Sequence, residues 1–224
     1  MQARLADLYA RTGNFAESAR LRNEMADSEP DENERFSLYV QIGQTLLAVG
    51  EGAEAASALE KALALRADRP ARALLLDAYT VAGTLDRAIA ILNELLADSK
   101  TMKAEELALL YQRQSKLAAA MGDKDGQLQA LKKALDVDRR SVAIANELAD
   151  LAESNGDDEL ALRALRVVAA NPVKDAKVLS LAFFRQARIA HRAKDRSRAI
   201  IFVKRALQED PQLEEARALL DQLR

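Results

Sequence analysis

One pattern of apolar and polar positions recurs along the whole chain. An apolar helical segment runs into a short turn of glycine and polar residues, and a second segment follows with Ala and Leu at fixed offsets; residues 80–85, for example, read TVAGTL. The turn anchors lie about 33 to 39 residues apart, and Lys replaces Gly in the last one: Gly13, Gly50, Gly83, Gly122, Gly156 and Lys194. A unit that recurs at such a period predicts helical hairpins that stack on their neighbours.

The segment after each anchor has a regular order of small and large residues. Five residues after the anchor stand Ser18, Ala55, Ala88, Gln127, Ala161 and Ala199. Nine residues after it stand Arg22, Leu59, Leu92, Leu131, Leu165 and Val203, and twelve after it Met25, Ala62, Leu95, Ala134, Val168 and Ala206. Small side chains let two helices approach closely and large ones fill the space between them, so we expect these positions to lie at helix crossings.

The pattern predicts an all-α protein with no strand. The expected helix pairs are 2–12 with 15–27, 34–49 with 53–66, 70–82 with 85–98, 102–121 with 124–137, 140–155 with 158–170, and 173–193 with 196–209. A final helix over 212–223 is expected to cover the end, with Asp210 as its N-cap and Pro211 at its first position. No change in composition marks a linker, so we treat 1–224 as a single superhelical domain with repeats at about 1–30, 34–67, 69–99, 101–138, 140–171 and 172–211.

This period and residue set resemble the tetratricopeptide repeat (TPR). That family has 34 residues per repeat, Gly at the turn inside the repeat, a small and a large residue in the second helix, and often Pro at the exit, where Pro30 and Pro211 stand here. The resemblance covers nearly the whole chain and implies an α-solenoid of about six TPR-like hairpins plus a capping helix. The longer spacings and Gln114 and Gln186 at positions that usually carry Leu depart from the family pattern, as does Arg22 at a core position. The Ala-, Leu- and Arg-rich style looks bacterial.

Composition agrees with a helical protein and narrows its chemistry. Ala and Leu make up roughly a third of the chain, and β-branched residues, which favour strands, are scarce. Cysteine is absent, which excludes disulfides, a thiolate nucleophile and a zinc–cysteine site. The 33 basic and 35 acidic residues give a net charge of −2, so no protein-wide field for nucleic acid or membrane is expected. No apolar run is long enough for a membrane span.

Candidate catalytic chemistry is sparse. His191 is the only histidine, so a histidine metal cluster is excluded and a triad has no spare partner. The segment Asp123-Lys124-Asp125-Gly126 resembles the start of a calcium loop, but it lacks the spaced oxygen ligands and the closing Glu, so we interpret its first Asp as a helix cap. The acids at 157–159 are interpreted as favoured residues of a first helical turn. We therefore expect no enzyme activity, no cofactor and no metal.

The resemblance implies that the first helix of each hairpin lines a concave groove that holds a partner. Groove-facing side chains in the family lie ten, six and three residues before the turn anchor. From the residues at these positions we take as candidate contacts Gln44, Asp77, Gln112, Lys116, Asn146, Asp150, Phe184, Arg188 and His191. No first helix carries the Lys and Asn pair with which the best-known family groove clamps a C-terminal carboxylate, so a receptor of that type is disfavoured.

Charge is concentrated in the last two repeats. Between Glu147 and Glu159 the chain has acids and no base, whereas residues 185–205 are strongly basic. Arg185, Arg188 and Arg192 share one helical face and are expected to be exposed. They form either a patch for an acidic peptide or anionic polymer, or the basic side of two stacked repeats that neutralise each other. Nucleic acid is disfavoured as the partner because the basic patch is short and Phe184 is the single aromatic residue available for stacking.

The leading functional interpretation is a non-catalytic scaffold that binds a peptide or helix of another protein in its groove. The alternatives are a structural segment of a longer TPR protein in a bacterial secretion, polysaccharide-export or polarity assembly, and anionic-polymer binding through the sixth repeat. Self-association is left open. No signal peptide is recognised, so a cytoplasmic location is expected if the chain is complete, and a periplasmic one is compatible with an excerpt of a longer protein.

Overall fold

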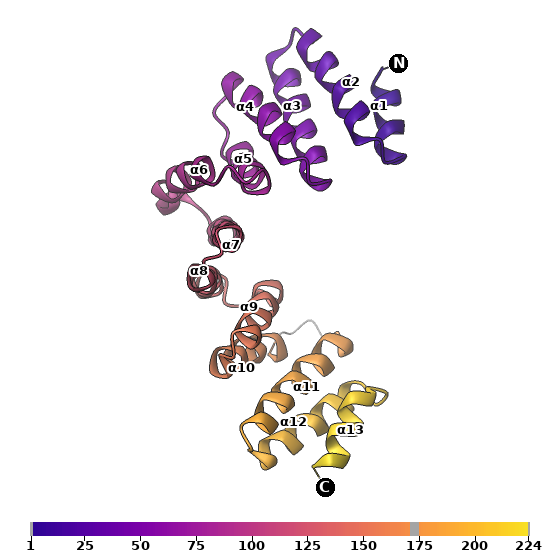
Figure 1. The fold of residues 1–224 in the computed structure, drawn as a ribbon, viewed down its shortest axis with the longest axis vertical. Coiled ribbons are helices and arrows are strands. Elements are labelled where there is room, and N and C mark those ends of the chain that lie inside the picture. Colours follow the sequence, from indigo (N-terminus) through magenta and orange to yellow (C-terminus); the bar gives the residue numbers. More distant parts are fainter. Residues whose placement is uncertain (1, 171–174, 224) are drawn as a thin grey trace. The chain divides into compact units, whose positions relative to one another are not determined.

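A computed structural model describes residues 2–170 and 175–223, and over these residues the protein is helical without any strand (Figure 1). The predicted all-α fold is confirmed. The helices are α1 (Gln2–Arg11), α2 (Phe15–Ser28), α3 (Glu32–Ala48), α4 (Gly52–Leu65), α5 (Arg69–Val81), α6 (Leu85–Ala97), the short 3-10 helix η1 (Ser99–Thr101), α7 (Ala104–Ala120), α8 (Lys124–Val137), α9 (Val142–Ser154), α10 (Asp158–Ala169), α11 (Ala176–Arg192), α12 (Arg196–Glu209) and α13 (Glu214–Gln222).

The chain forms two compact units, Met1–Gln127 and Leu128–Arg224, and each is described here by itself. The division falls inside α8. The predicted repeat limits and the single domain over 1–224 remain predictions, and the expected limit at 171/172 lies outside the described residues.

The turn anchors found in the sequence share one backbone conformation. The five glycines have positive φ, from 72° at Gly83 to 83° at Gly50, and Lys194 has φ 59°. After the first anchor, the amide of Asn14 donates to the carbonyl of Tyr9 (2.8 Å), and after the last, the amide of Asp195 donates to Ala190 (2.9 Å). This left-handed residue ends the helix and satisfies its last carbonyls, which explains why glycine recurs at this position.

Acidic, amide and hydroxyl side chains fix where the next helix begins. Asp31 accepts hydrogen bonds from the amides of Asn33 (2.8 Å) and Glu34 (3.0 Å) at the start of α3. The same capping role is taken by Asn14, Asp68, Ser141, Asp157, Asp175 and Asp195. Each cap satisfies amides that have no partner inside the helix, so the polar turn residues define the hairpins.

In the first unit, consecutive helices from α1 to α7 pack on one another. Ala55, Ala62 and Ala88 are fully buried at the predicted crossing positions, and Leu59 is buried between them. Gly43 of α3 lies against the Leu59 side chain, where an added Cβ would come within 2.5 Å of Cγ. The alternation of small and large residues therefore sets the distance between neighbouring helices.

Arg22, at a core position of the first repeat, is accommodated without a buried unpaired charge. Its guanidinium reaches Asp7 of α1 at 2.6 Å and donates to the hydroxyl of Thr45 at 3.2 Å. The long side chain thus extends out of the helix pair, so that its guanidinium meets polar partners at the edge of the pair, as arginine commonly does.

The second unit repeats this packing in α9 to α12, where Ala161, Ala199 and Ala206 are fully buried. Gln186 replaces the usual Leu and is 2% exposed, and its side-chain amide donates to the carbonyl of Leu165 at 3.4 Å. This hydrogen bond is how a polar residue is tolerated at a core position.

The final helix covers α12, as predicted, but begins later than expected. Ala216, Leu219 and Leu223 are buried against α12, and Leu213 and Leu220 are partly buried. The predicted cap was wrong: α13 begins at Glu214, and residues 211–212 form a turn outside it. Asp210 instead ends α12 and accepts a hydrogen bond from the amide of Gln212 at 2.9 Å.

Candidate functional site

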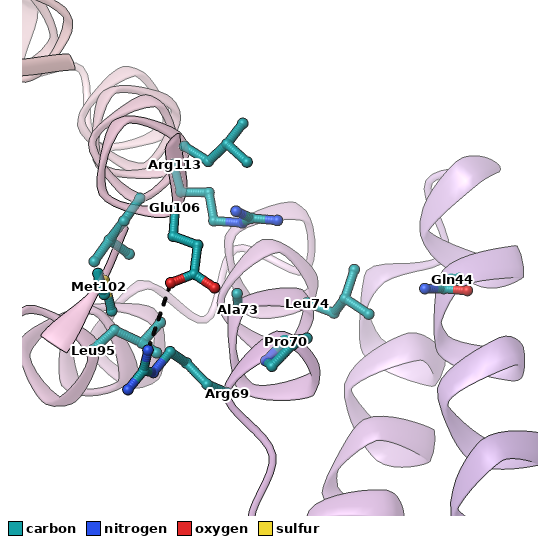
Figure 2. Close-up of a pocket in the computed structure, with 11 residues that line it drawn as sticks. Gln44, Arg69, Pro70, Ala73, Leu74, Leu95, Met102, Glu106 and Arg113 are labelled. Atoms are coloured by element: carbon teal, nitrogen blue, oxygen red, sulfur yellow. Dashed lines mark ion pairs between the residues drawn. The ribbon is translucent and has the colours of Figure 1, made fainter. Parts of the chain in front are cut away.

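Two adjoining hollows lie on the first unit, on a surface formed mainly by α3, α5 and α7, and Figure 2 shows the first of them. The first, of about 290 Å³, is lined by Gln44, Arg69, Pro70, Ala73, Leu74, Leu95, Met102, Glu106, Leu109, Leu110 and Arg113. The second, of about 530 Å³, is lined by Gln44, Leu47, Ala48, Leu74, Asp77, Thr80, Val81 and Lys116. Gln44 and Leu74 line both, so the two hollows form one continuous surface.

The lining combines apolar side chains with a few polar groups. Leu109 lines the first hollow and is 52% exposed, and Val81 lines the second and is 50% exposed. Large apolar side chains that are half exposed within a hollow suit a contact with another molecule.

An ion pair joins the two hollows. Nε of Arg113, which lines the first, lies 2.9 Å from Oδ2 of Asp77, which lines the second. Burial raises the pKa of Asp77, and the positive charges of Arg113 and Lys116 oppose that rise. This carboxylate is therefore held as a fixed internal partner of Arg113.

Two further charged groups border the first hollow, and one borders the second. Arg69 pairs with Glu106 across the hollow at 3.6 Å (dashed in Figure 2). Lys116 is exposed on α7 and forms no ion pair within 4.0 Å among the described residues. The hollows are thus bordered by three cationic and two anionic side chains. Two ion pairs join four of them, and Lys116 is the one that forms no ion pair in the described part of the chain.

The structure brings three of the predicted groove residues together. Gln44, Asp77 and Lys116 line the second hollow, whereas Gln112 is half-buried on α7 and lies outside both linings. Arg113, the residue that pairs with Asp77, was not predicted. The signal for it was weak, because it lies one position beyond Gln112 and carries no pattern of its own.

The other predicted groove residues lie in the second unit, on α9 and α11. Asp150, Arg188 and His191 are exposed, and Asn146 is half-buried. Phe184 packs partly against the core of α11 to α13, in agreement with a structural role for this aromatic.

The basic patch is largely neutralised by neighbouring acids. Arg185 is 20% exposed and lies 2.6 Å from Asp150 and 2.7 Å from Glu153, so the prediction that it is exposed was wrong. Arg192 pairs with Asp158. Arg188, by contrast, is exposed. These contacts agree with the interpretation of an acidic repeat stacked on a basic one.

The described residues offer neither a metal-binding cluster nor a membrane-spanning helix. They contain no group of three or more His, Asp or Glu placed to hold a metal ion. None of their helices combines the length and the apolar character needed to cross a membrane.

Comparisons with known proteins match one stretch of the chain to a family model and the fold to solved structures. Residues 40–102, which include α5 and α6, match the family model described as "Tetratricopeptide repeat". No curated protein matches the sequence. Similar solved structures include PilF from Pseudomonas aeruginosa, with 16% identity, a TM-score of 0.59, and coverage of 99% of this chain and 96% of that one.

Two further structures show the same fold. A putative kinesin light chain from Podospora anserina with TPR-like repeats has 18% identity and a TM-score of 0.60, over 87% of this chain and 98% of that one. YrrB, described as a TPR protein with an unusual peptide-binding site, has 17% identity and a TM-score of 0.55, over 81% of this chain and 89% of that one. At these identities the likeness concerns the fold.

Proposed function

Because the chain is a helical repeat protein of the TPR type, we propose that it is a scaffold that binds a segment of another protein in the two hollows on α3, α5 and α7. TPR proteins bind other proteins or peptides, and the family is in general non-catalytic. The observation that carries the proposal is the pair of hollows itself, where Leu109 and Val81 are about half exposed beside hydrogen-bonding and charged side chains. YrrB, of the same fold, is described as having a peptide-binding site, which supports the proposal by analogy.

The polar lining fits a peptide backbone. A chain that crosses the hollows has N–H and C=O groups that need partners once water is displaced. The Gln44 amide offers both a donor and an acceptor, whereas the Thr80 hydroxyl donates to the carbonyl of Leu76 (2.7 Å) and leaves its oxygen as an acceptor. Apolar side chains of the segment would supply the affinity, and these polar groups would orient it.

Binding of an anionic polymer is less well supported. The basic patch that suggested it has two of its three arginines paired with acids, namely Arg185 and Arg192. Paired charges contribute little to the long-range field that attracts a polyanion. The exposed Asp150, Arg188 and His191 and the half-buried Asn146 of the second unit remain proposed contacts that can be tested separately.

The proposal is tested with random twelve-residue peptides displayed on phage and selected on the immobilised protein. Binders are synthesised, and their Kd is measured by fluorescence polarisation for the wild type and for Leu74→Arg, which puts a charged side chain into both hollows. The control Ile201→Arg changes an apolar residue of α12 that is 53% exposed. We expect Leu74→Arg to weaken binding at least tenfold while the control binds like the wild type.

Circular dichroism confirms that each variant keeps its helical content. Failure to select any binder, or binders that Leu74→Arg leaves unaffected, contradicts the proposal.

A further inference from the structure

The two hollows lie at different heights along one helix. Ala73 of α5 lines the first and Thr80 lines the second, and seven residues separate them. At 1.5 Å of rise per residue, this separation is about 10 Å along α5. Leu74 lies between and lines both. A bound segment that fills both hollows therefore needs two apolar side chains about 10 Å apart on the same face.

This spacing discriminates between conformations of the bound segment. Residues i and i+7 of an α-helix lie on one face about 10.5 Å apart. An extended strand covers the same length in about three residues, which places the two side chains on opposite faces. A helix therefore places the two side chains both at the required distance and on the same face, whereas a strand meets only the distance.

The charged side chains that border the hollows determine which residue of the bound segment is favoured between its two apolar residues. Asp77 already pairs with Arg113 at 2.9 Å, and Arg69 pairs with Glu106 at 3.6 Å. Lys116 lies on the same lining, exposed and without an ion pair in the described part of the chain. Asp77, whose charge also acts on Lys116, is already paired with Arg113. A helix that covers Lys116 with an apolar or basic side chain would therefore bury a positive charge that has no ion pair of its own, which is costly.

We propose that the segment bound in these hollows is an amphipathic helix that lies along α5, with apolar residues two turns apart and an acidic residue between them that pairs with Lys116. The inference rests on the proposed function and goes beyond it, because it specifies the conformation of the partner segment and its charge. It commits to an acidic helix as the occupant through the spacing of the hollows and through charge complementarity at Lys116.

Two phage libraries test the inference against the same immobilised protein. One displays an Ala-rich helical scaffold randomised at positions i, i+3, i+4 and i+7, and the other displays linear twelve-residue peptides. We expect the helical library to yield binders with apolar residues at i and i+7 and Asp or Glu at i+3 or i+4. Replacing that acid by Lys should weaken binding at least tenfold.

A charge exchange tests the contact with Lys116. The Lys116→Glu protein should bind the acidic helix more weakly than the wild type does. It should bind more tightly the peptide in which Lys replaces the acidic residue of that helix. The matched control Lys124→Glu makes the same charge change at an exposed residue outside both hollows and should leave both affinities unchanged.

The outcomes separate this inference from the proposed function. If linear peptides with Pro inside their binding motif are selected, lose affinity in Leu74→Arg, and the helical library yields nothing, the helix inference is wrong and groove binding stands. Helical binders with no acid preference, or without the charge exchange, also overturn it. If neither library yields a binder that is sensitive to Leu74→Arg, both proposals fail.

Discussion

Lys194 carries a backbone cost that a single substitution should remove. It occupies the left-handed region at φ 59°, where every equivalent turn has glycine. This conformation costs a residue with a Cβ about 1–2 kcal/mol. Glycine avoids that cost but loses about 0.5–1 kcal/mol more conformational free energy on folding. The backbone contribution alone therefore favours Gly over Lys at position 194 by about 0.5–1 kcal/mol in the free energy of unfolding.

The charge of Lys194 must be separated from its backbone. A cation just after α11 can interact favourably with the helix dipole, by about 0.3–1 kcal/mol. Lys194→Ala removes the charge and keeps the Cβ, so it is the matched control. Lys194→Gly should be about 1 kcal/mol more stable than Lys194→Ala. As the converse, Gly156→Ala should be destabilising by a similar amount, because Gly156 has φ 75°. An added Cβ would meet no atom within 4 Å, so the loss would report the backbone strain and not a steric clash.

Urea unfolding followed by circular dichroism measures these differences, with comparison of midpoints at an unchanged slope. Amide hydrogen exchange in α11 and α12 shows that the change arises at this turn. If Lys194→Gly is no more stable than Lys194→Ala while Gly156→Ala is destabilised, then the Lys194 turn is not strained and the reasoning is refuted.

Three other predictions follow from contacts in the structure. Gly52→Ala should cost about 1–3 kcal/mol in urea unfolding, because an added Cβ would lie 2.5 Å from the backbone nitrogen of Ala82 and the backbone must shift; no loss would show that the helices separate freely. Arg185→Glu should lower the unfolding midpoint, because it places a third carboxylate beside two acids of α9, whereas the exposed Arg188→Glu should change stability by less than about 0.5 kcal/mol; equal effects would contradict the pairing. Burial raises the pKa of Tyr39 to about 12, whereas the pKa of tyrosine in the unfolded chain is near 10. The stability that the neutral Tyr39 contributes is therefore present below pH 10 and is lost between pH 10 and about 12. The free energy of unfolding of the wild type should fall relative to that of Tyr39→Phe over this range, and parallel pH profiles would contradict the prediction.

The sequence predicts the hairpins well because local physics determines them. A left-handed turn needs glycine, a helix start needs a capping side chain, and a close crossing needs Ala, so Gly83, Asp31 and Ala62 each indicate their own role. The end of the chain shows where local signals mislead. Asp210 and Pro211 have the composition of a helix start, but Asp210 caps a turn.

The candidate site was only partly predictable because it depends on side chains that are distant in the sequence. The resemblance to the tetratricopeptide repeat predicted that Gln44, Asp77 and Lys116 face one groove, and all three line the second hollow. It could not show that Arg113 turns toward Asp77, since that depends on the rotamers of both residues. Similarly, a helical period places Arg185 and Arg188 on one face but does not reveal that the acids of α9 draw Arg185 inward.

The most direct test of the central claim is a methyl NMR titration of the protein with a peptide selected on it. The methyl groups of Leu74, Val81 and Leu109 report on the two hollows, and those of Leu63 and Ile91, on α4 and α6, serve as references outside both linings. Groove binding predicts saturable shifts at the first three and little change at the references. Shifts at α4 and α6, with the methyl groups of the hollows unchanged, would contradict it.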